Sequence, residues 1–166
     1  MAYAAQYALT LDNWKNHQNV KEVRDIYNEI KYGINNNIYT SKNREFDVKS
    51  SLCATYPIKS ESIFIDVNNR LRLYKIEQIG SHREPFVVER YYDTNGVLRF
   101  VFVNYTFSNV RIYIDSSGNI IWAVEQSNNK FTVFDSANGD WEVRPDTAKE
   151  AGKAFKEPQS CPEIKK

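Results

Sequence analysis

Histidine, cysteine and glycine are scarce in this chain of 166 residues, and each shortage argues against a class of site. The two histidines, His17 and His82, lie in unrelated segments, and no Cys/His spacing typical of zinc ligands is present, so we predict no metal site. The six glycines form no phosphate-binding loop, Rossmann fingerprint or nucleophile elbow. We therefore expect no cofactor.

The chain also lacks an excess of either charge, because 22 Lys and Arg residues are balanced by 21 Asp and Glu residues. A protein that binds nucleic acid needs a basic surface to displace counterions from phosphates, so near-neutrality argues against that class of partner. No apolar run reaches the roughly 20 residues that span a bilayer, so we expect no membrane-spanning helix.

What the sequence does contain is a series of Asp-led polar turns between apolar runs. Asp and Asn bond back to their own backbone, and Gly adopts positive φ without steric cost, so such turns favour tight hairpins. The turns are Asp66-Val67-Asn68-Asn69, Asp93-Thr94-Asn95-Gly96, Asp115-Ser116-Ser117-Gly118 and Asp135-Ser136-Ala137-Asn138-Gly139. We interpret these Asp residues as turn formers, because the turns lack the ligand spacing of a calcium loop.

The runs between the turns are rich in β-branched and aromatic residues, which suit strands. Short connections between them require antiparallel neighbours. The sequence therefore predicts one antiparallel meander of about six to eight strands over residues 62–143. The expected strands are Ser62–Ile65, Leu71–Ile79, Phe86–Tyr92, Val97–Tyr105, Val110–Ile114, Ile120–Glu125, Lys130–Phe134 and Trp141–Val143.

An amphipathic helix is expected before the meander, within a helical region over residues 12–35. Asn19 and Glu22 have the spacing of a capping box at its start, and Gly33 with the following Asn residues is expected to end it. The length favours a single domain over residues 1–166, with an α+β fold in which the helix packs on the sheet. The apolar residues at helical spacing are Val23, Ile26, Tyr27, Ile30 and Ile34.

The run Val97–Tyr105 is apolar on both faces, which predicts a sheet covered on both sides. The helix is one cover. A terminal segment, strong curvature of the sheet into a half-barrel and a partner chain all remain open as the other. From Pro145 the chain becomes polar, and we expect residues 145–166 to form a C-terminal tail.

Cys53 and Cys161 are the two cysteines, and neither has a histidine nearby in sequence. We interpret them as a disulfide, which would stabilise the fold by roughly 4–5 kcal/mol because it closes a long loop. A disulfide indicates a compartment outside the reducing cytosol, so we expect a secreted or periplasmic protein. Ala2-Tyr3-Ala4 resembles a signal-peptidase site without a preceding apolar region, which fits either a mature exported chain or a loosely structured N-terminal segment.

Three Arg-x-Tyr triplets are the candidate binding residues: Arg72 with Tyr74, Arg90 with Tyr92, and Arg111 with Tyr113. The period of two in a strand would place each Arg on the same face as its Tyr. One interpretation is a patch that binds carboxylate-bearing or glycan-like ligands or a protein partner. The other is an exposed sheet face on which Arg lies over Tyr, with Glu77, Glu89 and Glu125 balancing the charge.

Two of the strand–turn–strand segments carry a family resemblance. Residues 89–102 read E-R-Y-Y-D-T-N-G-V-L-R-F-V-F and residues 111–122 read R-I-Y-I-D-S-S-G-N-I-I-W. They resemble a group of uncharacterised bacterial exported proteins with Y-Y-D-x-x-G-x-L-R-F-V-F and R-I-Y-F-D-x-x-G-x-x-I-W runs. The upstream helix and Cys53 are also similar to that group, although this chain has Ile114 in place of Phe and lacks a Gly-rich insert between the runs. The resemblance implies export and a compact α+β domain, and it implies no activity.

Three functions are compatible with these features. The first is a non-catalytic binding or inhibitor-type domain that uses the Arg/Tyr face or a sheet edge. The second is a structural or assembly component, possible as a homo-oligomer, whose apolar sheet face packs on a partner. The third is a hydrolase that uses carboxylates such as Glu89 and Asp93, which we disfavour because those two would be about 13 Å apart along one strand.

Overall fold

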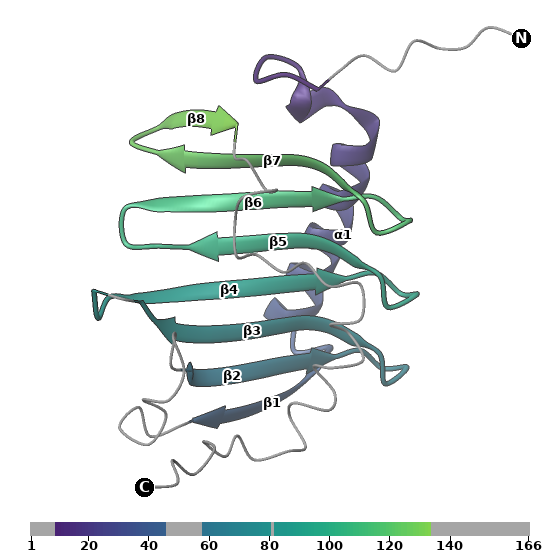
Figure 1. Ribbon diagram of the computed structural model, residues 1–166. Coiled ribbons are helices and arrows are strands. Elements are labelled where there is room, and N and C mark those ends of the chain that lie inside the picture. The colour runs from purple at the N-terminus through teal and green to yellow at the C-terminus, as the bar shows by residue number, and fades with distance from the viewer. Residues whose placement is uncertain (1–8, 46–57, 81, 134–166) are drawn as a thin grey trace, which may run out of the picture.

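The computed structural model describes residues 9–45, 58–80 and 82–133. Within them a 3₁₀ turn, η1, and one α-helix, α1, precede eight strands that are hydrogen-bonded in chain order, each antiparallel to the next (Figure 1). The prediction of a helix on an antiparallel meander is confirmed. The elements are η1 (Trp14–Asn16), α1 (Gln18–Asn35), β1 (Thr40–Glu45), β2 (Ile58–Ile65), β3 (Leu71–Ile79), β4 (Pro85–Tyr92), β5 (Leu98–Asn104), β6 (Ser108–Ile114), β7 (Ile120–Ser127) and β8 (Lys130–Val133).

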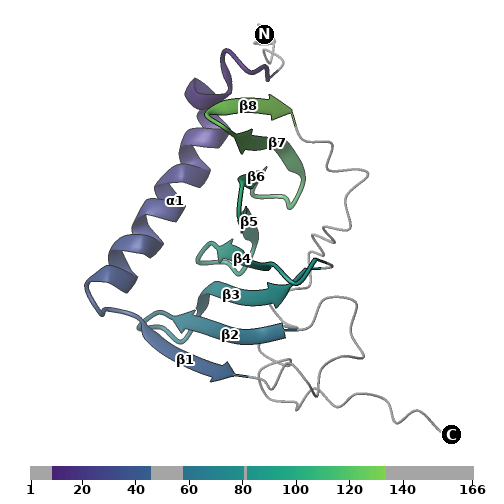
Figure 2. The same ribbon diagram turned by 90° about the vertical axis from the view of Figure 1, so that its left-hand side faces the viewer.

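The helix runs across the strands rather than along them (Figure 1). It begins beside β7 and β8 and ends beside β1, and the chain then returns across the sheet strand by strand. Figure 2 shows α1 lying over one face of the open sheet. Because the helix crosses the strands, residues at successive positions along it meet successive strands.

Both ends of α1 differ from the prediction. The cap is His17, whose Nδ1 accepts a hydrogen bond from the Asn19 backbone N–H at 3.3 Å, so the expected capping box of Asn19 and Glu22 is wrong. Gly33 lies inside the helix, which continues to Asn35, and the Gly33 carbonyl accepts hydrogen bonds from the N–H groups of Ile38 and Tyr39. The helix therefore starts two residues earlier than predicted and ends two residues beyond the glycine.

The strand predictions need two corrections. Residues 40–45 form β1, although their polar sequence gave no strand signal, because β1 is an exposed edge strand with almost no apolar side chain to bury. Strand β2 begins at Ile58 rather than at Ser62. Several predictions concern residues outside those that the structure describes: the Asp135 turn, the strand Trp141–Val143, the tail 145–166, Cys53 and Cys161.

Buried side chains lie on both faces of the sheet, as the run Val97–Tyr105 predicted. On the first face, sheet residues pack with η1 and α1; on the second, no described element lies over the buried side chains. The first-face core contains Trp14, Val20, Val23, Ile30, Leu73, Tyr91, Phe100, Tyr113, Trp122 and Val124. The second-face core contains Ile63, Tyr74, Ile76, Val88, Tyr92, Leu98, Val101, Val103, Val110, Ile112, Ile114 and Ala123.

Three hairpin turns repeat one hydrogen-bond pattern. Oδ1 of Asp66, Asp93 and Asp115 each accepts the backbone N–H groups of the second and fourth residues after it, at 2.9–3.0 Å. The third residue after each Asp has positive φ, 62° at Asn69, 79° at Gly96 and 87° at Gly118, which explains the Asn or Gly there. The interpretation of these three Asp residues as turn formers is confirmed.

These hydrogen bonds favour the ionised carboxylates. Burial by itself would raise the pKa of Asp66, but bonds from the backbone and side chain of Arg70 and from the Asn68 N–H outweigh it and hold the pKa below its usual value. The Asn119 N–H is the main cause that lowers the pKa of Asp115, which lies close to the surface. Folding stability should therefore depend on pH through these two turns.

We expect Asp115→Asn to lower the free energy of unfolding by about 1 kcal/mol at pH 7. A carboxyl whose pKa is depressed in the folded state stabilises the fold above its unfolded pKa, 3.8, and loses this effect as the pH falls through the folded value. The difference between variant and wild type should therefore disappear below about pH 3. Urea unfolding at pH 7, 5 and 2.5 measures it, with the exposed helix residue Asp25→Asn as the control. A difference that stays constant over this range would contradict the explanation.

Candidate functional site

The six residues of the three Arg-x-Tyr triplets do not form one patch. Tyr74 and Tyr92 lie in the second-face core, and Arg90 packs over the Tyr74 ring at 5.8 Å. Tyr113 lies in the first-face core, and Arg111 packs over first-face rings. The sheet therefore divides the triplets between its two faces.

The first triplet is also split within itself, because a β-bulge interrupts the alternation of side chains. Phe64 pairs with Leu73 and Ile65 pairs with Leu71, which leaves Arg72 without a partner in the ladder. Arg72 consequently lies on the helix side, while Tyr74 points to the second face and donates a hydrogen bond to Glu61 at 2.6 Å. Burial is the main cause that raises the pKa values of both second-face phenols, that of Tyr92 to about 12.

Arg72 is a buried structural cation, with 2% of its surface exposed. Its Nε donates to the Tyr92 carbonyl at 3.1 Å, and its Nη1 donates to Glu29 of α1 at 3.0 Å. The same Nη1 lies 3.5 Å from Oδ2 of Asp66 and 3.3 Å from the Tyr39 hydroxyl. Arg72 therefore joins its own hairpin turn, the next hairpin and the helix; we call this set of contacts the Arg72 bridge.

Arg99, which the sequence analysis missed, makes the same contacts one hairpin further along. Its Nε donates to the Ile114 carbonyl at 3.1 Å, its Nη1 to Asp93 at 3.2 Å and its Nη2 to Glu22 of α1 at 3.0 Å. It too stands at a bulge, because Tyr91 pairs with Phe100 while Tyr92 pairs with Leu98. A signal was present in the sequence, since both arginines stand six residues after the Asp of a turn. We call these contacts the Arg99 bridge.

The spacing of the helix matches that of the hairpins. Glu22 and Glu29 are seven residues apart, which is about 10.5 Å along an α-helix. Arg72 on β3 and Arg99 near the start of β5 are separated by two inter-strand steps, about 9.6 Å. Two turns of helix therefore advance by about the width of one hairpin, so Glu22 and Glu29 are spaced to meet Arg99 and Arg72.

Among the residues that the structure describes, the third hairpin makes no equivalent bridge to the helix. Its bulge residue is Ile121, which packs against the first-face core, and the chain carries Lys15 seven residues before Glu22. In the series of positions seven residues apart, Lys15 thus carries a cation, whereas Glu22 and Glu29 carry carboxylates. The part of the first face next to β6, β7 and β8 is consequently rich in cations and poor in carboxylates.

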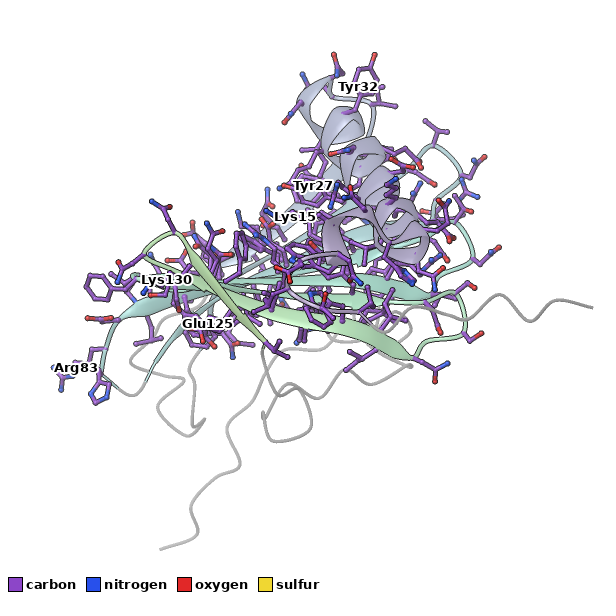
Figure 3. The ribbon with its side chains drawn as sticks, turned by 90° about the horizontal axis from the view of Figure 1, so that it is seen from above. Lys15, Tyr27, Tyr32, Arg83, Glu125 and Lys130 are labelled. Carbon is purple, nitrogen blue, oxygen red and sulfur yellow. The ribbon has the colours of Figure 1, made fainter. Side chains whose placement is uncertain are left out.

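A cleft of about 550 Å³ opens at this end, between η1 and α1 on one side and β5 to β8 on the other. Figure 3 shows Lys15 and Tyr27 on the helix side of the sheet, whereas Tyr32 points away from it. Most of the lining is aromatic. The lining residues are Trp14, Lys15, Val23, Arg24, Tyr27, Phe100, Phe102, Arg111, Tyr113, Gln126 and Phe131.

The three cations of the lining, Lys15, Arg24 and Arg111, have no salt bridge to a carboxylate in the described part of the chain. Arg24 donates to the Lys15 carbonyl at 3.2 Å, and Arg111 donates to the Gln126 amide oxygen at 2.8 Å. The nearby carboxylate of Glu89 binds Lys31 and the Tyr91 hydroxyl instead. The cleft therefore carries net positive charge that its own lining does not neutralise.

The Phe131 ring on β8 connects two of these cations. The Lys15 ammonium lies 4.6 Å from the ring centroid, and the Arg111 guanidinium lies 5.6 Å from it. Trp14 packs edge-on against the same ring at 5.8 Å. Phe131 thus holds cations from the helix side and the sheet side close to one apolar surface.

The remaining polar groups of the lining are mostly donors. Burial raises the pKa values of Tyr27 and Tyr113, and the positive charge of Arg111 opposes this without reversing it, so both phenols stay neutral at pH 7. The indole Nε1 of Trp14, a residue 2% exposed, is buried without an acceptor among the described residues. The lining therefore combines cations with phenol and indole side chains that can donate hydrogen bonds.

Arg111 and Tyr113 are the two predicted binding residues that line this cleft; the other four predicted residues lie elsewhere. The described residues contain no group of three or more His, Cys, Asp or Glu that could hold a metal ion. None of the described helices has the length and apolar character needed to cross a membrane. The chain matches no protein-family model, no curated protein and no solved structure.

Proposed function

We propose that this chain is an exported, non-catalytic binding domain whose ligand occupies the cleft between α1 and β5–β8. The observation that carries the proposal is the lining, which combines unpaired cations with aromatic side chains in a concavity of about 550 Å³. Clefts of this size, mostly apolar and with a few polar groups, are typical of small-molecule sites.

The carboxylates considered for hydrolysis have structural partners, which supports binding over catalysis. Glu89 accepts from the Tyr91 hydroxyl and from Lys31, and it lies 3.6 Å from Lys75. Asp93 accepts two backbone N–H groups of its turn and pairs with Arg99. Neither side chain lines the cleft, so neither is placed to act on a ligand bound there.

The burial of the second face supports binding over assembly. Its apolar side chains, among them Val103 and Ile112 at 0% exposed, are buried within the single chain. A mass from light scattering that corresponds to a stable oligomer would favour the assembly role instead.

Binding in the cleft can be tested with the tryptophans. We expect small ring compounds, screened in neutral, cationic and anionic forms, to shift the fluorine resonance of Trp14 in protein labelled with 5-fluorotryptophan. Trp14→Phe assigns that resonance. Phe131→Ala should weaken binding by at least about fivefold, since it removes a wall of the cleft and the contact between Lys15 and that ring.

The matched control is Phe107→Ala, which makes the same chemical change at a residue 79% exposed in the β5–β6 connection. It should leave binding unchanged. If no compound of any charge shifted the Trp14 resonance, or if both variants had equal effects, the cleft would not be the binding site.

The proposal of an exported location rests on the predicted Cys53–Cys161 disulfide and on the resemblance to exported proteins. Both cysteines lie outside the described residues, so the bond stays a prediction. Iodoacetamide should add no mass to the folded or denatured protein before reduction and should modify both cysteines after it. Modification of the denatured, unreduced protein would refute the bond.

A further inference from the structure

We infer that the ligand of this cleft is a small anion carried on a planar apolar ring, such as an aromatic sulfonate, carboxylate or phosphate ester. The inference rests on the proposed function and specifies its ligand class. Two independent observations support it: the balance of charge in the lining of the cleft, and the unpaired indole N–H of Trp14, which is one of the lining residues.

The charge balance selects an anion. Lys15, Arg24 and Arg111 line one cleft, and no carboxylate lines it in the described part of the chain. Elsewhere on the same face the cations are paired, Arg72 with Glu29 and Arg99 with Glu22. Like charges repel one another in a partly enclosed site, so an anion binds there with a favourable electrostatic energy that a neutral or cationic ligand lacks.

The unpaired donor on Trp14 also favours an anionic ligand. Trp14 Nε1 is a donor only, and in the described residues it is buried without an acceptor. A buried donor without a partner is costly, and a ligand oxygen within reach would remove that cost. Anionic groups are strong acceptors, and charge-assisted hydrogen bonds to them are stronger than neutral ones.

The walls select a flat apolar ring. The lining includes the rings of Trp14, Phe102 and Phe131. It also includes Phe100 and Tyr113, whose ring centroids are 5.0 Å apart. Aromatic walls stabilise a flat ring through offset or edge-to-face contacts. A small inorganic anion would leave most of this surface wet, so the ring is part of the recognised ligand.

The probe for this inference is naphthalene-2-sulfonate, compared with 2-naphthalenemethanol, 2-naphthylmethylammonium and methanesulfonate. We expect the aromatic sulfonate to bind at least about tenfold more tightly than each of the other three, as measured by calorimetry and by the Trp14 fluorine shift. The affinity for the sulfonate should fall as the salt concentration rises.

Variants with matched charge changes complete the test. Arg111→Gln and Lys15→Gln should each weaken sulfonate binding by about fivefold or more and leave binding of the neutral alcohol nearly unchanged. Arg83→Gln removes the same charge from an exposed residue in the β3–β4 turn, far from Lys15 and Tyr27 in Figure 3, and should have no effect. Lys15 is exposed, so its variant remains informative if Arg111→Gln fails to fold.

The outcomes separate this inference from the proposed function. If neutral or cationic rings shift Trp14 as strongly as the sulfonate, or if Lys15→Gln and Arg111→Gln leave sulfonate affinity unchanged, the anion is not recognised and the inference is wrong, while a binding cleft remains. If methanesulfonate binds as well as naphthalene-2-sulfonate, the ring is not recognised. If none of the four probes binds, both statements fall.

Discussion

Replacement of Arg99 with methionine is expected to lower the free energy of unfolding by about 3–5 kcal/mol. Arg99 is 3% exposed and neutralises Asp93, which is itself buried. Removing the guanidinium leaves that carboxylate without its charged partner and the Ile114 carbonyl without a side-chain donor. The loss is a large part of the 5–15 kcal/mol that typically separates the folded and unfolded states. Urea unfolding followed by tryptophan fluorescence measures it.

The helix partner of this bridge should matter much less. The Glu22 side chain is 52% exposed, so Glu22→Gln should cost about 1 kcal/mol or less, because solvent screens an exposed ion pair. Arg99→Lys should fall between the two variants, since an ammonium keeps the charge but not the fork that reaches three acceptors at once.

Comparable effects of Arg99→Met and Glu22→Gln would contradict the buried bridge. Arg72→Met provides an independent repeat, because the Arg72 bridge has the same types of acceptor: a backbone carbonyl, a glutamate of α1 and the Asp of a turn. A large loss at Arg99 together with a negligible loss at Arg72 would show that the two bridges are not equivalent.

Replacement of Gly33 with alanine is expected to destabilise the protein by about 2 kcal/mol, although alanine is the better helix former by about 1 kcal/mol. A Cβ atom on Gly33 would lie 2.7 Å from Cζ of the Tyr39 ring and 2.8 Å from its Cε1. The ring cannot move away freely, because its hydroxyl accepts a hydrogen bond from Arg72. The change should therefore push Tyr39 off the helix and weaken the Arg72 bridge.

Two controls separate this clash from a general effect on the helix. Asn28→Ala, at an exposed site of the same helix, should be neutral or slightly stabilising, as helix propensity predicts. In a double-mutant cycle, Tyr39→Ala should remove most of the cost of Gly33→Ala, because the atoms that the new methyl group meets are then absent. A Gly33→Ala variant as stable as the wild type would show that the Tyr39 ring is not confined.

The pairing order of the sheet and the turns could be predicted because their determinants are local. Each Asp and the Asn or Gly three residues after it lie within one turn, and short connections leave an antiparallel neighbour as the sole arrangement. Strand β1 was missed because its determinant is not local. An exposed edge strand has little apolar pattern, and β1 forms because β2 offers it hydrogen-bond partners.

The candidate site was predicted less completely. Arg111 and Tyr113 were named as binding residues and both line the cleft, while Lys15, Arg24 and Phe131 were not considered. Their segments are far apart in sequence, and nothing in a local pattern brings them together. For Arg72 the Arg-x-Tyr spacing was the wrong feature to compare. The structural counterpart of Arg72 is Arg99, because each stands six residues after the Asp of a turn.

By itself, the sequence determined the antiparallel meander, three of its turns and the amphipathic helix, because each depends on residues within a few positions of one another. The tertiary structure decided which face each arginine occupies and where a cleft opens. The bulges at Arg72 and Arg99 turn these side chains toward a helix up to 77 positions away in sequence, and no local period encodes that contact. Lys15 and Arg111 likewise meet at the Phe131 ring only once the helix lies across the strands, at the hairpin where the described residues form no third bridge.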